Sequence, residues 1–338
     1  MTLNDKITLL TQLGKYLQTD TEELAAVKHK AYLHNKWFTV ANIDKALSAI
    51  SEAFLQEDKL RAWLKPYKIE DTEKTKTVAL VLAGNIPLVG FHDVISVFLA
   101  GHRALIKLSE KDKFLLPFLV NQMLKIAPAA AAYFEFTERL QQFDAVIATG
   151  SNNSARYFES YFSKYPNIIR KNRSSVAILN GKESSEVLLA LGSDVFDYFG
   201  LGCRNVSKLY LPQGYDFDAL LRALYNYKEV VLHDKYKNNF DYNYTLLILN
   251  KIAYEANGCI LLTEATSLQS RIACLHYEYY SDEADLAEKL STKMAEIQCV
   301  VGEFSLAQNE VIPMGKAQQP TLSDYADGVD TMQFLVEI

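Results

Sequence analysis

The residue best suited to covalent chemistry in this sequence is a cysteine, Cys203, within the segment Tyr198-Phe-Gly-Leu-Gly-Cys-Arg-Asn205. We expect this segment to join a helix that ends in glycines to a strand at 206–211. A thiol in such a turn meets exposed backbone N–H groups, and the adjacent Arg204 adds positive charge, so the thiolate is favoured. Taken alone, a cysteine in a turn is more often a small packing residue.

Motifs that would define other chemistries are absent from the sequence. It contains no G-x-G-x-x-G, no phosphate-binding G-x-x-x-x-G-K-[ST], no G-x-S-x-G and no C-x-x-C. His29 and His34 are five residues apart, so they do not share a helix face as metal ligands at i and i+4 would. No metal site is expected. A doubly wound sheet can bind a dinucleotide without the glycine fingerprint, so nicotinamide chemistry stays open.

The elements around these residues alternate between short apolar strands and helices. We predict helices throughout 1–65, with Asn42 as the N-cap of a helical stretch at 43–64. The strands are predicted at 77–83, 104–108, 144–148, 175–179 and 206–211. The helices between and after them are predicted at 88–99, 114–125, 152–162, 184–199, 216–228 and 282–297. Such alternation is typical of β-α-β units and a parallel sheet.

Composition indicates a large globular α/β protein. The chain has 338 residues, of which 49% are hydrophobic and 22% charged, with a formal net charge of −6. A single core stops growing at about 250–300 residues, so we predict two domains, 1–183 and 184–338. No basic stripe is present, which argues against a nucleic-acid partner. Four unevenly spaced cysteines are typical of reduced thiols in a cytosol rather than of a disulfide framework.

Hydrophobic runs in the sequence are too short or too interrupted for a membrane span. The most apolar stretch, 78–106, contains Asn85, His92 and Asp93, among other polar residues. Near the N-terminus, Asp5 and Lys6 interrupt what would be the apolar region of a signal peptide. We therefore expect a cytoplasmic protein without a membrane span.

Six segments, in order, resemble motifs of the aldehyde dehydrogenase superfamily, and within it the LuxC-type fatty acyl-CoA reductases. The resemblance extends from residue 78 to the C-terminus, and each motif is specific only in combination with the others. The segments are Leu82-Ala-Gly-Asn85-Ile-Pro-Leu88, Ala104-Leu-Ile-Lys107-Leu-Ser109-Glu110, Ala148-Thr-Gly150-Ser151, Val176-Ala-Ile178-Leu-Asn-Gly181-Lys182, Gly200-Leu-Gly-Cys203 and Ile312-Pro-Met-Gly315.

This resemblance implies a fold and a set of roles. The fold would be α/β, with N-terminal helices and a Rossmann-type cofactor domain in 1–183 and an α/β catalytic domain with a C-terminal tail in 184–338. Cys203 would be the nucleophile, and Asn85 would donate a hydrogen bond to the oxyanion. The implied cofactor-binding residues are Lys107, Ser109, Gly150 and Ser151.

The implied reaction is NAD(P)H-dependent reduction of an acyl-CoA to an aldehyde through a cysteine-bound acyl group. The cofactor would be NADPH or NADH, and coenzyme A would enter as part of the substrate. Exchange of an acyl group between two sulfurs is near thermoneutral, which favours a cysteine for a thioester substrate. Ile178 occupies the place of the glutamate that activates water in hydrolytic relatives, which favours transfer to a thiol.

Two other functions stay open at this stage. One is an NAD(P)-dependent aldehyde dehydrogenase that hydrolyses its intermediate, and the other is a non-catalytic nucleotide- or acyl-binding relic of the fold. The basic run Arg170, Lys171 and Arg173 could hold the phosphates of coenzyme A or an NADP 2′-phosphate. A solvated surface cluster is the plainer interpretation of that run. The oligomerisation arm of the superfamily is not recognisable before Thr77, and a homodimer is left open.

Overall fold

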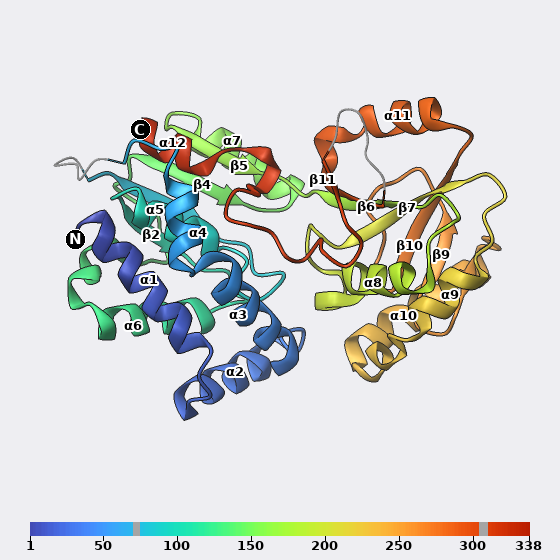
Figure 1. Ribbon diagram of the computed structural model, residues 1–338, viewed down its shortest axis with the longest axis horizontal. Helices are drawn as coiled ribbons and strands as arrows, with labels where there is room; N and C mark the ends of the chain where they lie inside the picture. Colours follow the sequence, from blue (N-terminus) through green and yellow to red (C-terminus); the bar gives the residue numbers. More distant parts are fainter. Residues whose placement is uncertain (70–74, 304–309) are drawn as a thin grey trace. The chain divides into compact units, whose positions relative to one another are not determined.

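The computed structural model describes residues 1–69, 75–303 and 310–338. It divides into two compact units, Met1–Asn172 with Pro320–Ile338, and Arg173–Gln319 (Figure 1). The chain therefore leaves the first unit after Asn172, before the boundary predicted at residue 183, and its last segment returns to that unit. Each unit contains a sheet that is wholly or mostly parallel, so the prediction of an α/β fold is confirmed.

The N-terminal 64 residues are helical, as predicted, but the helical stretch at 43–64 is divided. The helices are α1 (Leu3–Leu17), α2 (Glu22–His34), α3 (Val40–Phe54) and α4 (Glu57–Leu64). The N-cap of α3 is Thr39 and not Asn42, because the Thr39 hydroxyl accepts a hydrogen bond from the Asn42 backbone N–H at 3.2 Å. The prediction that Asn42 is the cap is therefore wrong by three residues.

The sheet of the first unit has the strand order β3-β2-β1-β4-β5 within the described residues, and all its pairings are parallel. The chain builds β2 and β3 on one side of β1, and then crosses to build β4 and β5 on the other side. The order thus reverses between β1 and β4, which is where open α/β sheets bind ligands. The strands are β1 (Thr77–Val81), β2 (Arg103–Lys107), β3 (Phe134–Phe136), β4 (Ala145–Thr149) and β5 (Asn167–Arg170).

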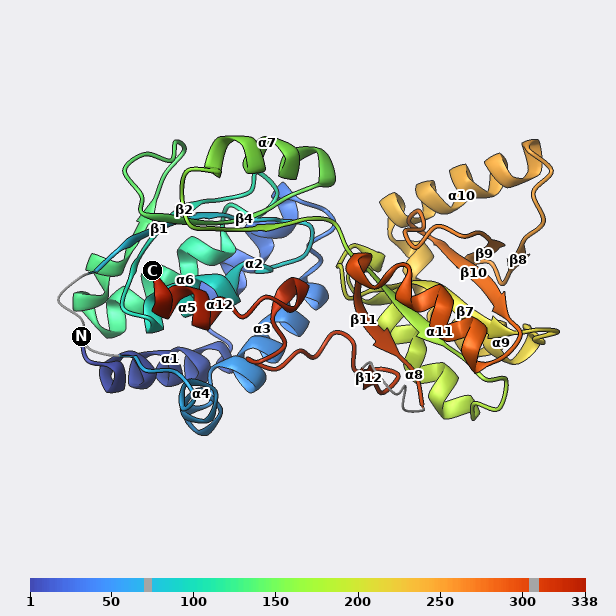
Figure 2. The ribbon, with the colours of Figure 1, turned by 90° about the horizontal axis from the view of Figure 1, so that it is seen from above.

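Helices cover both faces of this sheet, because alternate residues of each strand point to opposite faces. Val78 and Leu80 of β1 belong to the large core formed with α1, α5 and α6, whereas Ala79 packs with Val146 and with Phe162 of α7. Figure 2 shows α7 on one face and α5, α6 and α12 on the other. These helices are α5 (Phe91–Leu99), α6 (Leu115–Ile126), α7 (Asn152–Phe162) and α12 (Thr331–Glu337), and a 3-10 helix spans Pro128–Tyr133.

The sheet of the second unit has the order β12-β11-β6-β7-β10-β9-β8 in the described part of the chain, and β8 alone runs antiparallel to its neighbour. Its strands are β6 (Ser174–Ile178), β7 (Val206–Pro212), β8 (Glu255–Ala256), β9 (Leu261–Glu264), β10 (Cys274–Tyr280), β11 (Ile297–Val301) and β12 (Val311–Ile312). Its helices are α8 (Ser185–Phe196), α9 (Asp218–Tyr225), α10 (Asp234–Leu249) and α11 (Glu283–Ser291), with 3-10 helices at Asp197–Gly200, Lys228–Leu232 and Met294–Glu296.

One face of this second sheet is covered by α11. Val176, Ile178 and Tyr210 form a buried cluster with Leu286 and Leu290 of that helix. The helix predicted over 282–297 therefore ends earlier, at Ser291, and a separate apolar run forms β11 from Ile297 onward. In Figure 1, α8, α9 and α10 lie on the other side of this sheet.

Candidate functional site

The Cys203 loop lies between the 3-10 helix Asp197–Gly200 and β7, at the amino end of that strand. Asn205 fixes this loop from inside the unit. Its side-chain amide donates to the backbone carbonyls of Asp194 (3.0 Å) and Asp197 (2.9 Å), while its Oδ1 accepts from the Gly202 N–H (2.8 Å). Because Asn205 is buried, these bonds are shielded from water and hold the turn in one conformation.

The backbone before Cys203 is strained. Tyr198, Phe199 and Gly200 have φ angles of 52°, 60° and 73°, which places three successive residues in the left-handed region. For each of the two aromatic residues this conformation costs about 1–2 kcal/mol. The Phe199 ring packs against His233, with ring centroids 4.3 Å apart. Tyr198 and Phe199 are both buried. Strain that the surrounding structure maintains in this way is typical of functional sites.

Ser175 links the Cys203 loop to the start of β6. Its hydroxyl donates to the backbone carbonyl of Cys203 at 2.9 Å and lies 3.0 Å from the Cys299 sulfur, so it can accept a hydrogen bond from that thiol. The two remaining cysteines, Cys259 and Cys274, are poor nucleophiles. Burial raises the pKa of the Cys259 and Cys274 thiols to about 11, which keeps both protonated at neutral pH.

The turn at 312–317 is tied to the same helix end as the Cys203 loop. The buried Asp194 carboxylate accepts from the backbone N–H groups of Gly315 (2.6 Å) and Ala317 (2.9 Å). Arg204 Nε donates to the Ala317 carbonyl at 2.5 Å. Burial raises the pKa of Asp194 to about 6, although the two N–H donors act in the opposite direction. Two of the predicted motif segments are thus brought together, and Arg204 serves to hold them there.

Ile178 does not lie beside Cys203, contrary to the prediction that it replaces a catalytic glutamate there. The strand register pairs Ser175 with Val206 at one end of β6 and Ile178 with Tyr210 at the other. Three residues along a strand correspond to about 10 Å. Ile178 is fully buried against α11 and has a packing role. The sequence argument against hydrolysis that rested on Ile178 is therefore wrong.

Asn85 and the predicted cofactor residues all lie at or just after the carboxyl ends of parallel strands of the first unit. Asn85 lies in the loop after β1, Lys107 ends β2, Ser109 follows it, and Gly150 and Ser151 follow β4. The register pairs Val81 with Lys107 and Val81 with Ala148, so these three strands end side by side at one edge. The structure thus brings the five residues to the edge where the strand order reverses.

Gly150 and Ser151 shape the turn from β4 into α7. A Cβ on Gly150 would come within 2.8 Å of the Ser154 Cβ and 2.9 Å of the Phe158 ring, so only glycine allows this close approach. Ser151 is the N-cap of α7, and its hydroxyl accepts from the Ser154 N–H at 3.2 Å. The remaining N–H groups of the first turn have no partner within the helix, which suits an anionic group such as a phosphate.

The basic run at 170–173 does not form one binding cluster. Arg170 is buried and makes a two-pronged ion pair with Asp93. Lys171 is exposed and pairs with Glu159 at 2.7 Å, while Arg173 belongs to the second unit and donates to the Ile297 carbonyl. The prediction that Arg170 holds a ligand phosphate is corrected, because its guanidinium forms a buried ion pair with Asp93 inside the first unit.

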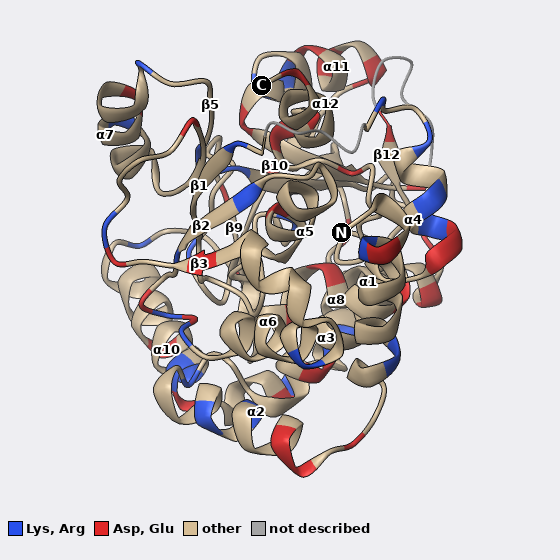
Figure 3. Ribbon diagram, turned by 90° about the vertical axis from the view of Figure 1, so that its left-hand side faces the viewer, with Lys and Arg blue, Asp and Glu red and all other residues tan. Residues whose placement is uncertain are grey.

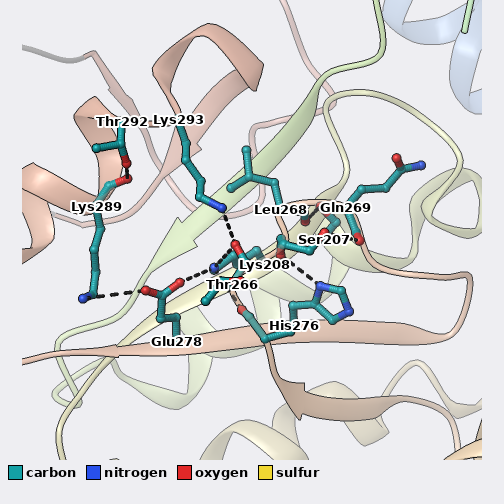
Figure 4. A network of polar contacts seen from close by, with 12 residues as sticks. Ser207, Lys208, Thr266, Leu268, Gln269, His276, Glu278, Lys289, Thr292 and Lys293 are labelled. Atoms are coloured by element: carbon teal, nitrogen blue, oxygen red, sulfur yellow. Dashed lines mark hydrogen bonds and ion pairs between the residues drawn. The ribbon is translucent and has the colours of Figure 1, made fainter. Parts of the chain in front are cut away.

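A buried lysine in the second unit has a structural role. Lys208 Nζ donates to the carbonyls of Ala265 and Thr266 (3.0 Å each) and to the Glu278 carboxylate (2.5 Å), which uses all three of its protons (Figure 4). Burial lowers the pKa of Lys208, whereas Glu278 opposes that effect. The Lys293 ammonium also donates to the Thr266 carbonyl. This network attaches the segment after β9 to the sheet.

Surface helices of the first unit carry both signs of charge. Figure 3 shows acidic and basic residues on α2 and on α4. On α4, Glu57 and Arg61 form an ion pair at 2.9 Å. Among the described residues, no helix has the length and apolar character needed to cross a bilayer.

Comparisons with known proteins bear on this arrangement. Residues 5–214, more than half of the chain, match the family model described as acyl-CoA reductase (LuxC). The chain is 26% identical over 187 residues to long-chain acyl-protein thioester reductase 2 of Photobacterium leiognathi, a match that covers 50% of this chain and only 38% of that relative.

Solved structures share the fold at low sequence identity. An NADP dependent enzyme from E. coli is 12% identical with a TM-score of 0.69, over 91% of this chain and 74% of that one. An aldehyde dehydrogenase from Pseudomonas syringae is 10% identical with a TM-score of 0.64, over 90% and 73% of the two chains. The fold is thus that of the aldehyde dehydrogenases, as expected. With the LuxC model matching most of the first unit and the start of the second, this chain belongs to the LuxC acyl-CoA reductase family.

Proposed function

We propose that this protein reduces acyl-CoA thioesters to aldehydes with a reduced nicotinamide cofactor, through an acyl group carried on Cys203. The observation that carries the proposal is the Cys203 loop, which is strained at Tyr198 and Phe199 and held by the buried Asn205. A cysteine that only filled a turn would not need this support. Membership of the LuxC family supplies the substrate class, an acyl thioester.

The chemistry can be written so that every bond is accounted for. The Cys203 thiolate attacks the thioester carbonyl, and the resulting oxyanion collapses to expel the thiolate of coenzyme A, which takes up a proton. The product is a thioester on Cys203. Addition of a hydride and a proton gives a thiohemiacetal on Cys203, whose carbon–sulfur bond then breaks to release the aldehyde and restore the thiol. We assign Asn85 as a donor to the oxyanion, a contribution typically worth about 3–4 kcal/mol.

A nicotinamide cofactor, when bound, supplies the hydride. We assign its binding to Lys107, Ser109, Gly150 and Ser151, because they share the carboxyl edge of the first sheet. The glycine turn and the N-terminus of α7 suit a phosphate, and Lys107 is exposed at the end of β2. The Pseudomonas syringae structure is described as complexed with NAD+ and octanal, which supports a nicotinamide cofactor for this fold.

Intact-protein mass spectrometry tests the covalent step. After mixing with acyl-CoA alone, we expect an acyl adduct on Cys203 that free coenzyme A discharges, and none on a Cys203→Ser variant. With reduced cofactor, the adduct should be lost and aldehyde should appear. Release of free fatty acid by the wild-type protein without cofactor would instead favour the hydrolytic alternative.

The rate of thiol labelling distinguishes a reactive Cys203 nucleophile from a non-catalytic protein with the same fold. Iodoacetamide should modify Cys203 faster than Cys259 and Cys274, because the raised pKa of those two thiols leaves little thiolate. Equal or slower labelling of Cys203 would favour a non-catalytic protein. We also propose a reducing, cytoplasmic location, because the four unevenly spaced cysteines form no disulfide framework. A homodimer remains a prediction.

A further inference from the structure

Asp112, in the segment between β2 and α6, is a buried carboxylate that contacts the Asn85 loop. Its Oδ2 accepts a hydrogen bond from the backbone N–H of Leu88 at 2.9 Å. Leu88 lies three residues after Asn85 and has a φ of 57°, a left-handed conformation that a leucine rarely adopts. The carboxylate therefore holds the loop at its most strained residue.

The surroundings of Asp112 are almost entirely apolar. A small pocket beside it is lined by the side chains of Leu82, Phe91 and Leu116, among others. Its second oxygen, Oδ1, has no hydrogen-bond partner among the described residues. Burial raises the pKa of Asp112 to about 6, and backbone N–H groups, that of Leu88 foremost, act in the opposite direction.

The residues next to Asp112 in the chain make the following contacts away from its carboxylate. On its own segment, Lys113 pairs with Glu110 at 2.5 Å. Lys111 offers its backbone carbonyl to the side-chain amide of Asn35, which follows α2. From α2 itself, the His34 ring reaches the carbonyl of Glu110. None of these groups contributes to the pKa of Asp112, so its ionised form relies on backbone donors alone.

The Asn85 loop is also pressed against the segment that carries Asp112. A Cβ on Gly84 would lie 2.5 Å from the Ser109 hydroxyl and 3.2 Å from the Lys111 Cβ. The loop after β1 and the loop after β2 thus fit together without room for a side chain at residue 84. Displacement of Leu88 would therefore shift Asn85 relative to this support.

We propose that Asp112 is a positioning residue that fixes the Asn85 side chain for oxyanion binding by holding the Leu88 backbone. The proposal rests on the oxyanion role assigned to Asn85 above. Asp112 itself touches neither substrate nor cofactor in this scheme. An ionised acceptor binds an N–H more strongly than a neutral one, so the carboxylate fixes the Leu88 backbone more tightly than a neutral side chain would.

Hydrogen exchange followed by mass spectrometry tests the holding of the loop without any need for activity. We expect exchange of a peptide spanning 82–90 to be at least tenfold faster in Asp112→Ala than in the wild type at pH 7.5. Asp112→Asn keeps an acceptor for Leu88 and should restore most of the protection. Asp144→Asn is the matched control, because Asp144 accepts from the Thr77 N–H at the opposite end of β1. Exchange in Asp112→Ala no faster than in this control overturns the proposal.

A double-mutant cycle tests whether Asp112 acts through Asn85. Asp112→Ala should lower kcat at least tenfold in the wild-type background and less than twofold in an Asn85→Ala background. Equal losses in the two backgrounds overturn the proposal. A wild-type protein that reduces no acyl-CoA overturns the proposed function instead, and the exchange measurement still tests the contact of Asp112 with the loop.

The pH dependence provides a test that does not need the alanine variant to fold. Because burial raises the pKa of Asp112 to about 6 in the closed loop, protonation stabilises that loop relative to an open loop in which the carboxyl group reaches water. After correction for intrinsic rates, exchange of the 82–90 peptide in the wild type should therefore fall severalfold between pH 7.5 and pH 5, with a midpoint near 6. Asp112→Asn should show no such midpoint. A wild-type loop that is equally protected at both pH values, or an unchanged midpoint in Asp112→Asn, contradicts the proposal.

Discussion

Replacing Arg170 with alanine should destabilise the first unit and leave ligand binding nearly unchanged. The Arg170 guanidinium donates to both carboxylate oxygens of Asp93, at 2.5 and 2.9 Å, and to the Thr331 hydroxyl at 3.0 Å. These contacts join β5, α5 and α12. Both charged side chains are less than a tenth exposed. Removal of the arginine therefore leaves the Asp93 carboxylate buried without its counter-ion.

The size of the effect follows from that burial. Breaking a buried ion pair by removing one partner costs about 3–5 kcal/mol. The lost bond to Thr331 adds about 1 kcal/mol. For a unit of this size each kcal/mol lowers Tm by roughly 2–4 °C, so we expect a fall of roughly 8–24 °C. The matched control is Lys171→Ala, whose ion pair with Glu159 is half exposed on both sides and is worth less than about 1 kcal/mol.

Thermal and urea unfolding of the two variants measure this difference, and limited proteolysis follows α12. Because Thr331 begins α12, the C-terminus of Arg170→Ala should be cleaved faster than that of Lys171→Ala. Below the unfolding transition, KM for acyl-CoA and for NADPH should stay within twofold of the wild type. The reasoning is refuted if Arg170→Ala unfolds like Lys171→Ala, or if it is stable and raises KM for either phosphate-bearing ligand tenfold.

Three further predictions concern the candidate site. Cys203→Ser should lower reductase activity more than about 10³-fold while the Kd for NADPH, measured by fluorescence, changes less than twofold, because a hydroxyl lacks thiolate character; retained turnover would exclude the covalent route. Lys107→Ala should raise KM for the nicotinamide cofactor about tenfold and leave KM for acyl-CoA unchanged; an equal effect on both would remove Lys107 from the cofactor site. The raised pKa of Asp194, about 6, means that stability is lost as pH rises from about 4 through 6, by about 3 kcal/mol. Urea unfolding at pH 4.5 and pH 7.5 should show about 2 kcal/mol of this loss in the wild type and not in Asp194→Asn, and a loss of the same size in both proteins would contradict it.

The strands that position the site could be predicted because they are short apolar runs. The runs at 104–108 and 175–179 correspond to β2 and β6 with a shift of one residue, and 206–211 corresponds to β7. In contrast, β10 (Cys274–Tyr280) was not predicted. Its buried residues are Leu275 and Tyr277, but a cysteine and two further tyrosines stand at its half-exposed positions, so the alternation in burial is not visible in the sequence. Periodicity reports burial, so a half-exposed strand gives little signal.

The motif residues could be predicted, but most residues that support them could not. Cys203 and Ser151 belong to local patterns, and each lies where its pattern implied. Asp194 and Asp112 instead contact residues 121 and 24 positions away, Gly315 and Leu88. A sequence gives no register between such distant segments. The prediction that Ile178 lies beside Cys203 was wrong for the same reason, because only the pairing of β6 with β7 shows which end of the strand Ile178 occupies.

Both units use a buried carboxylate to fix the backbone of a motif turn. Asp112 holds Leu88 in the first unit, and Asp194 holds Gly315 and Ala317 in the second. In both cases burial raises the pKa to about 6, so the ionised form present at neutral pH makes the fold less stable. An asparagine at either position could still accept one N–H bond without that loss. We therefore explain the carboxylates of Asp112 and Asp194 by how tightly they fix the backbone of the turn, and not by a gain in the free energy of unfolding, because an ionised oxygen binds the backbone N–H more tightly than a neutral one does.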